Sequence, residues 1–171
     1  YSESTVLTDY HVAPTCSPTR AALLSGHWTN RTGVWHTIMG RSMIRENEIT
    51  LGQHFANHYA TAMFGKWHLG YEPKFNPAEH GWDAFFGYLG GNVHYFNHRE
   101  TSDLHVLFDG NMPVYREGYM TKLITDESVR FIKEQTEPFF LLVSHESPHF
   151  PFQGPTDQGK LVTAENWMEI D

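Results

Sequence analysis

The sequence predicts an α/β fold in which a mostly parallel central sheet is flanked by helices. A helical pattern at residues 119–135 leads into a continuous apolar run at residues 139–143, as expected of a strand covered on both faces in a parallel sheet. A second apolar run of strand type lies at residues 60–64. Polar clusters follow both runs. Since ligands bind at the carboxyl ends of such strands, these clusters mark the expected site.

Composition supports a packed domain and excludes some functions. Of the 171 residues, 40% are hydrophobic and 15% are aromatic, which is typical of a folded chain. The net charge of -8 offers no basic surface to a phosphate backbone, so nucleic acid is not an expected partner. No apolar run approaches the roughly 20 residues that cross a bilayer, so no membrane span is expected.

Several elements are expected before the long helix. Residues 6–12 alternate apolar with other side chains in the period of a half-buried strand, which Pro14 ends. Residues 50–58 predict a short helix that precedes the strand at residues 60–64. Residues 70–118 are rich in Gly, Pro, Asn and aromatic residues without a long period, which predicts loops and short elements.

A helix is also expected directly after the single cysteine, Cys16. Ser17 is a suitable N-cap, Pro18 suits the first helical position, and the Ala/Leu run that follows ends at Gly26. Cys16 therefore lies at a helix N-terminus. There the exposed N–H groups and the helix dipole favour an anion and lower the pKa of an unmodified thiol.

The long helix at residues 119–135 has one apolar face, and Pro138 ends it before the strand at residues 139–143. Because both predicted strands run parallel, the clusters at residues 66–68 and 145–149 should meet at one edge of the sheet. The helical face consists of Met120, Leu123, Ile124, Phe131 and Ile132, with Ser128 completing it.

Three segments, in this order, resemble the motifs of the type I, formylglycine-dependent sulfatases. They are CSPTRAALLSG at residues 16–26, GKWHLG at residues 65–70 and SHESPHFP at residues 144–151. Residues 70–86 are similar to the stretch that follows the second motif in arylsulfatases and N-acetylgalactosamine-6-sulfatases. The resemblance implies an alkaline-phosphatase-like α/β sandwich, incomplete in this chain. Residues 1–171 would be part of its N-terminal catalytic domain, with an upstream strand and a C-terminal part outside them.

The resemblance implies hydrolysis of aryl or carbohydrate sulfate esters. A maturation enzyme would oxidise Cys16 to formylglycine, whose hydrate is the nucleophile. Arg20 would hold this hydrate, Lys66 would contact the sulfate, His68 would hydrogen-bond the diol, and His149 would assist the leaving group. A sulfated small molecule or glycan is the expected substrate, and the periplasm, the lysosome or the cell exterior is the expected location.

Further residues are weaker candidates by resemblance. His145, Asn92 and His94 are candidate substrate contacts. The family's Ca²⁺, or Mg²⁺ in its place, is held by paired Asp-Asp and Asp-Asn residues that these 171 residues lack. Only the formylglycine oxygen at Cys16 would then reach the metal from this chain.

Other interpretations remain open. Taken singly, Arg20 could be a solvated helix residue, Lys66 a surface cation and His149 a loop residue, but their joint order favours function. Phosphate and sulfate are both tetrahedral oxyanions, so a phosphoester or phosphonate hydrolase of the same fold is an alternative. A non-catalytic module that binds sulfated glycans, with Cys16 still a thiol, is another.

Overall fold

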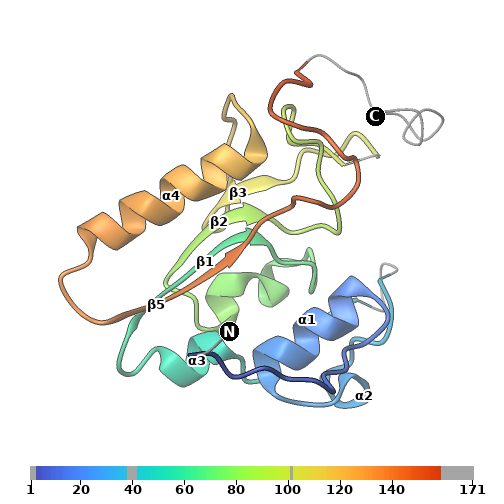
Figure 1. The fold of residues 1–171 in the computed structure, drawn as a ribbon, viewed down its shortest axis with the longest axis vertical. Helices are drawn as coiled ribbons and strands as arrows, with labels where there is room; N and C mark the ends of the chain where they lie inside the picture. The colour runs from blue at the N-terminus through green and yellow to red at the C-terminus, as the bar shows by residue number, and fades with distance from the viewer. Residues whose placement is uncertain (1–2, 38–41, 101, 159–171) are drawn as a thin grey trace.

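The computed structural model describes residues 3–37, 42–100 and 102–158. A sheet is packed between one long helix on one face and several short helices on the other (Figure 1). The elements are α1 (Cys16–Ser25), α2 (Thr29–Thr32), α3 (Leu51–Phe55), β1 (Ala60–Lys66), η1 (Pro73–Phe75), η2 (Pro77–His80), β2 (Ala84–Tyr88), β3 (Leu107–Asp109), β4 (Met112–Pro113), α4 (Met120–Glu134) and β5 (Phe139–Ser144).

The sheet has the strand order β4-β3-β2-β1-β5. Strand β1 pairs in parallel with β2 and β5, whereas β3 and β4 are added antiparallel. The predicted α/β class is confirmed, and the sheet is mixed, with its three parallel strands side by side. The antiparallel strands β3 and β4 need only a tight turn between them, so they extend the sheet without a crossover helix.

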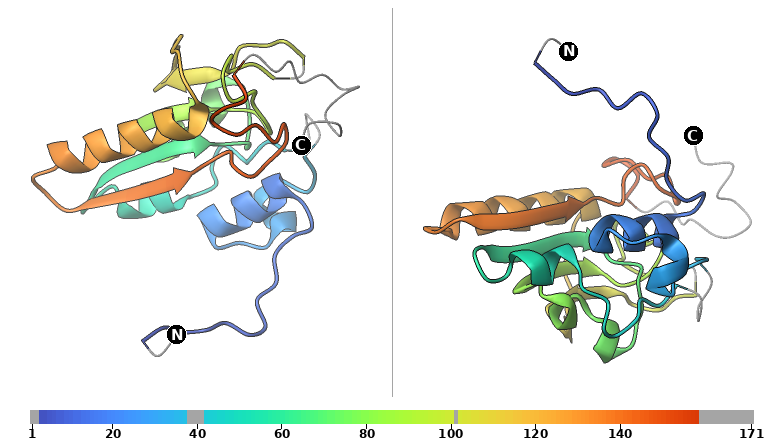
Figure 2. Two further views of the ribbon diagram at one scale, coloured as in Figure 1. Left: turned by 45° about the horizontal axis from the view of Figure 1, so that its top comes forward. Right: turned by 90° about the horizontal axis from the view of Figure 1, so that it is seen from below.

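Alternate side chains of β1 enter two separate cores. Met63 packs on one face with Leu24 of α1, whereas Phe64 packs on the other face with Ile124 of α4. Figure 2 shows α4 on one side of the sheet and α1 and α3 on the other. Strand β1 lies between β2 and β5 and is buried on both faces, so the residues at its carboxyl end are rigidly placed.

The predicted strand at residues 6–12 is wrong. The structure describes this segment as an irregular stretch that leaves the body of the molecule (Figure 2). Val6, Tyr10 and Val12 are 55%, 65% and 59% exposed. Alternation specifies one apolar face, but a strand also needs a neighbour to satisfy its backbone, and no described strand pairs with this segment.

Strand β5 is present, but it is not covered on both faces as predicted. Phe139 and Val143 are each 38% exposed. In the described sheet β5 is the outermost strand and pairs only with β1, so its faces receive fewer neighbours than those of a central strand. An apolar run therefore predicted the strand but not its position in the sheet.

The predicted helices are present with shifted ends. Helix α1 has Thr15 as its N-cap rather than Ser17, because the Thr19 N–H already donates to the Thr15 carbonyl oxygen at 3.3 Å. Helix α3 follows Thr50, whose N–H donates to Oε1 of Gln53 at 2.9 Å. Cys16 thus remains in the first turn of its helix, as expected. The stretch 70–118 holds short elements, as predicted, among them the central strand β2.

Candidate active site

The two polar clusters lie at one edge of the sheet. Strands β1 and β5 end at Lys66 and Ser144, and their parallel register places Gly65 opposite Ser144. A Cβ on Gly65 would lie 1.9 Å from the Ser144 carbonyl oxygen, and Gly65 has a φ of 108°. Only glycine allows this approach. The structure thus brings residues 66–68 and 145–149 together, as the sequence predicts.

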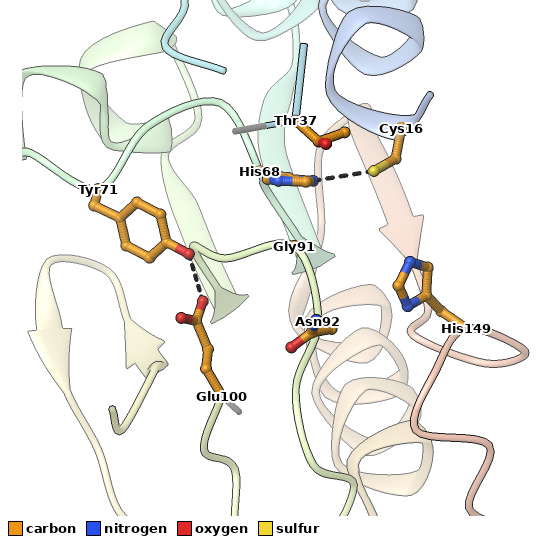
Figure 3. Close-up of a pocket in the computed structure, with 8 residues that line it drawn as sticks. All are labelled: Cys16, Thr37, His68, Tyr71, Gly91, Asn92, Glu100 and His149. Carbon is orange, nitrogen blue, oxygen red and sulfur yellow. Dashed lines mark hydrogen bonds between the residues drawn. The ribbon is translucent and has the colours of Figure 1, made fainter. Parts of the chain in front are cut away.

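Cys16 begins α1 at this same edge and shares a pocket with two histidines (Figure 3). Its Sγ lies 3.3 Å from Nδ1 of His68. Burial raises the pKa of the Cys16 thiol, but hydrogen bonds from His149 and His68 and the charge of Lys66 outweigh burial and lower it to about 5. An unmodified residue 16 therefore carries a thiolate at neutral pH.

His149 follows β5 and extends its ring toward Cys16 (Figure 3). Its Nδ1 lies 2.8 Å from the Phe150 carbonyl oxygen and 3.5 Å from Oε1 of Glu146. The hydrogen bond with Cys16 raises the pKa of His149 to about 10, with a further rise from Glu146 and an opposing effect of burial. His149 is thus an imidazolium that faces the thiolate.

Glu146 orients this loop, and the sequence analysis did not single it out. The residue is 2% exposed and accepts hydrogen bonds from the Tyr88 hydroxyl and, at 3.4 Å, from the Val93 N–H. It also lies within ion-pair distance of His149. A carboxylate between two histidines, directly after an apolar strand, is the signal that could have found it. A buried charge needs several partners, and histidines can supply them.

Arg20 joins three segments beneath the pocket. Its Nε donates to the Trp67 carbonyl oxygen at 2.7 Å, and its Nη2 donates to the carbonyl oxygen of Lys66. Both terminal nitrogens also lie near Oγ of Ser144, at 3.5 and 3.4 Å. Burial lowers the pKa of Arg20 to about 10, which leaves the guanidinium charged at neutral pH. Arg20 therefore holds the start of α1 against the ends of β1 and β5.

Lys66 provides a cation just below the pocket. Its side chain is 6% exposed, and Nζ donates to the Gly91 carbonyl oxygen at 2.5 Å. Burial lowers the pKa of Lys66, while the charges of Cys16 and Glu146 oppose this effect. The ammonium group is therefore fixed near Cys16 with little water around it, which strengthens its attraction for an anion.

The pocket has a volume of about 300 Å³ and includes Asn92 among the predicted substrate contacts. The other two predicted contacts do not line it. His145 is exposed beside β5. His94 faces its own loop, because its Nδ1 accepts from the N–H groups of Phe96 and Asn97 and its Nε2 lies 2.9 Å from Nε2 of Gln153.

Apart from Gly91, the sequence analysis missed three residues that line the pocket. They are Thr37, Tyr71 and Glu100, which come from three separate loops. Figure 3 shows Tyr71 and Glu100 on the side away from Cys16 and His149. No motif or period marks them, since only the folded chain brings their loops together.

The expected metal ion finds no complete site here. Within residues 3–37, 42–100 and 102–158, no group of three or more His, Cys, Asp or Glu side chains could hold a metal ion. The described residues alone therefore do not fit a Ca²⁺ or Mg²⁺ site.

In the same described ranges, no helix is long and apolar enough to cross a membrane.

A family model described as Sulfatase matches residues 2–165. Arylsulfatase J of Mus musculus is 31% identical to the chain over 168 residues, which cover 90% of this chain and 28% of that protein. N-acetylgalactosamine-6-sulfatase of Sus scrofa is 32% identical over 195 residues, covering 95% and 37%. The chain thus spans about a third of the length of these curated relatives.

Solved structures show the same fold. The structure of BT4656 in complex with its substrate D-glucosamine-2-N,6-O-disulfate superposes with a TM-score of 0.65 at 25% identity. The matched region covers 84% of this chain and 27% of that chain. This likeness confirms the α/β fold expected from the resemblance.

Proposed function

Because the chain belongs to the sulfatase family, we propose that it is the N-terminal part of the catalytic domain of a sulfuric ester hydrolase, with Cys16 as the precursor of formylglycine. One observation carries the proposal. Cys16 lies in the first turn of α1, 3.3 Å from His68 and hydrogen-bonded to His149, with the buried Lys66 ammonium nearby. This is a compact set of proton donors and a cation around one reactive side chain, at the edge of the sheet where ligands bind.

The geometry at residue 16 suits a formylglycine. Once hydrated, this group supplies one hydroxyl oxygen as the nucleophile. The second hydroxyl then loses its proton, which re-forms the aldehyde and expels sulfate. Nδ1 of His68, now 3.3 Å from Sγ, is within hydrogen-bond reach of an oxygen in the same position. His68 would hold that oxygen in one orientation, and its ring is fixed in turn by the adjacent backbone of Gly91.

His149 is proposed to exchange a proton with the ester oxygen that leaves. The largest contribution to its raised pKa comes from the Cys16 thiol. Conversion of that thiol to an uncharged group removes this contribution, so the pKa of His149 falls toward the neutral range, with Glu146 still raising it. An imidazole with a pKa nearer the working pH is a better general acid and base.

Lys66 and Arg20 are proposed to act differently. The buried ammonium of Lys66 would attract the sulfate oxygens, as an electrostatic stabiliser of the developing charge. The donors of Arg20 point at backbone carbonyl oxygens and Ser144, so Arg20 would position Cys16 rather than contact the substrate. Asn92, in the pocket wall, would contact the substrate beyond the sulfate. The metal ion would depend on residues other than those described here.

The proposed substrate class is the aryl and carbohydrate sulfates, and a formylglycine-generating enzyme is the proposed maturation partner. Two comparisons support a carbohydrate sulfate. One relative is an N-acetylgalactosamine-6-sulfatase, and the structure with a TM-score of 0.65 holds a sulfated glucosamine as its substrate.

The test is to produce the protein that carries this chain together with a maturation enzyme. Intact-mass analysis should show Cys16 converted to the aldehyde, and nitrophenyl sulfate should be hydrolysed much faster than nitrophenyl phosphate. Cys16→Ala should be inactive. Faster turnover of the phosphate ester would favour a phosphoester hydrolase, and an unconverted thiol with sulfated-glycan binding but no turnover would favour a binding module.

A further inference from the structure

The wall of the pocket opposite His149 contains a paired phenol and carboxylate. The Tyr71 hydroxyl donates a hydrogen bond to Oε1 of Glu100, and both residues line the pocket that contains Cys16 (Figure 3). Neither residue belongs to the sequence motifs that surround Cys16. The pair therefore lies in the site but outside the set of residues proposed to react.

The distance between this pair and His68 is set by two consecutive glycines. A Cβ on Gly90 would lie 1.7 Å from Oε1 of Glu100 and 2.6 Å from the Tyr71 hydroxyl. A Cβ on Gly91 would lie 2.7 Å from Cε1 of His68. The Tyr71–Glu100 pair and His68 thus pack against adjacent glycines of one backbone segment. This contact fixes the position of Glu100 relative to His68.

Tyr71 keeps its proton and acts as a donor to the carboxylate. Burial, the hydrogen bond with Glu100 and the charge of Glu100 all raise the pKa of Tyr71, with a smaller opposing effect from the Gly91 backbone. A carboxylate has about four lone-pair sites. In the part of the chain that the structure describes, the Tyr71 hydroxyl is the hydrogen-bond partner found on the Glu100 side chain. Glu100 thus retains acceptor capacity toward the pocket.

The two ends of the pocket differ in charge. Lys66 provides a buried cation near Cys16, and the ring of His149 lies beside it, so a sulfate group would be attracted to this end. Glu100 provides an anion at the other side. A ligand that fits both ends has a sulfate at one end and neutral or cationic hydrogen-bond donors at the other, which describes a sugar with hydroxyl or amino groups.

Resting on the sulfatase function proposed above, we propose that Tyr71 and Glu100 form a specificity site for the sugar ring of a carbohydrate sulfate. Glu100 accepts hydrogen bonds from ring hydroxyl or amino groups, and it disfavours rings with a second sulfate or a carboxylate on that side. The discrimination arises because a bound donor gains a charge-assisted hydrogen bond, whereas a second anion is repelled.

The test compares Glu100→Gln with the parent protein in its converted form. Substrates are nitrophenyl sulfate, which has no ring hydroxyl, a panel of monosulfated hexoses, and their disulfated counterparts. Glu100→Gln should lose about 10-fold in kcat/KM on the preferred monosulfated hexose, the size expected for one hydrogen bond to a charged group. The kcat/KM for nitrophenyl sulfate should stay unchanged. The ratio of kcat/KM for the monosulfated hexose to that for the disulfated hexose should fall.

The matched control is Glu117→Gln, which removes the same charge from an exposed position. It should leave kcat/KM unchanged on all three kinds of substrate. Turnover of nitrophenyl sulfate by the parent tests the proposed function separately, since that substrate does not involve Glu100. Direct binding of the hexose sulfates to Cys16→Ala tests the specificity site without turnover. The inference would be overturned if Glu100→Gln lowered kcat/KM equally on aryl and hexose sulfates. It would also be overturned if adding Glu100→Gln to Cys16→Ala left the affinity for the hexose sulfates unchanged.

Discussion

Arg20 and Trp67 are joined by a hydrogen bond of 2.7 Å from the guanidinium Nε to the backbone carbonyl oxygen. This contact links α1 to the backbone directly after β1. Cys16 and His68 are 52 positions apart in the sequence, yet their side chains are 3.3 Å apart. The Arg20 contact explains how that distance is maintained, because it joins the helix that carries Cys16 to the backbone next to His68.

Replacement of Arg20 by Ala should therefore lower stability. The carbonyl oxygens of Lys66 and Trp67 would lose their guanidinium donors, and unsatisfied buried polar groups cost about 1–3 kcal/mol each. We expect a loss of about 2–4 kcal/mol in the free energy of unfolding, measured by urea denaturation. Arg31→Ala, at an exposed position of α2, is the control and should cost under about 0.5 kcal/mol. A similar stability for both variants would contradict the positioning role of Arg20.

The unconverted Cys16 thiol should react at low pH. Its pKa is about 5 rather than 9.0, so the thiolate forms as pH rises through about 5 and persists at neutral pH. Alkylation by iodoacetamide, followed across pH 4 to 10 by mass spectrometry, should show a midpoint near that value. In His149→Ala the midpoint should move upward, because a hydrogen bond that stabilises the thiolate is lost. An unchanged midpoint would show that His149 does not act on the thiol.

Lys66 should matter for the reaction more than for folding. Lys66→Met keeps the buried hydrocarbon stem and removes the charge, so the fold should be retained. We expect kcat/KM for nitrophenyl sulfate to fall by about 10²-fold or more, the scale of one lost electrostatic stabiliser. Lys133→Met, at an exposed position near the end of α4, is the control. Near-normal kinetics of Lys66→Met would place Lys66 outside the sulfate site.

His149 and His145 should differ in their dependence on the leaving group. General acid catalysis contributes about 10²- to 10⁴-fold and matters most when the leaving oxygen is basic. His149→Ala should therefore lose far more activity on an alkyl or sugar sulfate than on nitrophenyl sulfate. His145→Ala, which removes an exposed ring outside the pocket, should affect both substrates alike. Equal losses for His149→Ala would indicate binding or structure instead of proton donation.

Local sequence signals predicted the elements that carry the site. Proline and the Ala/Leu run placed a helix after Cys16, and apolar runs located β1 and β5 with their polar residues directly behind them. Such signals are short-range, so they succeed where the chain within a few residues decides the conformation. They misplaced the N-cap at Ser17 because the start of a helix depends on which carbonyl first accepts an i+4 bond.

The same signals failed where distant parts of the chain decide the outcome. The alternation at residues 6–12 has no partner among the described strands, and the apolar run of β5 could not indicate an edge position. Tyr71 and Glu100 carry no local pattern that distinguishes them from other polar loop residues.

The sequence by itself determined that this protein has an α/β fold and a sulfatase-type arrangement of Cys16, Lys66, His68 and His149 along the chain. Only the tertiary structure decided that Arg20 turns to the backbone, that His94 and His145 lie outside the pocket, and that Glu100 lies within it. The physical reason is that burial and hydrogen bonding depend on which loops share an edge of the sheet. That arrangement arises from packing between segments far apart in the chain.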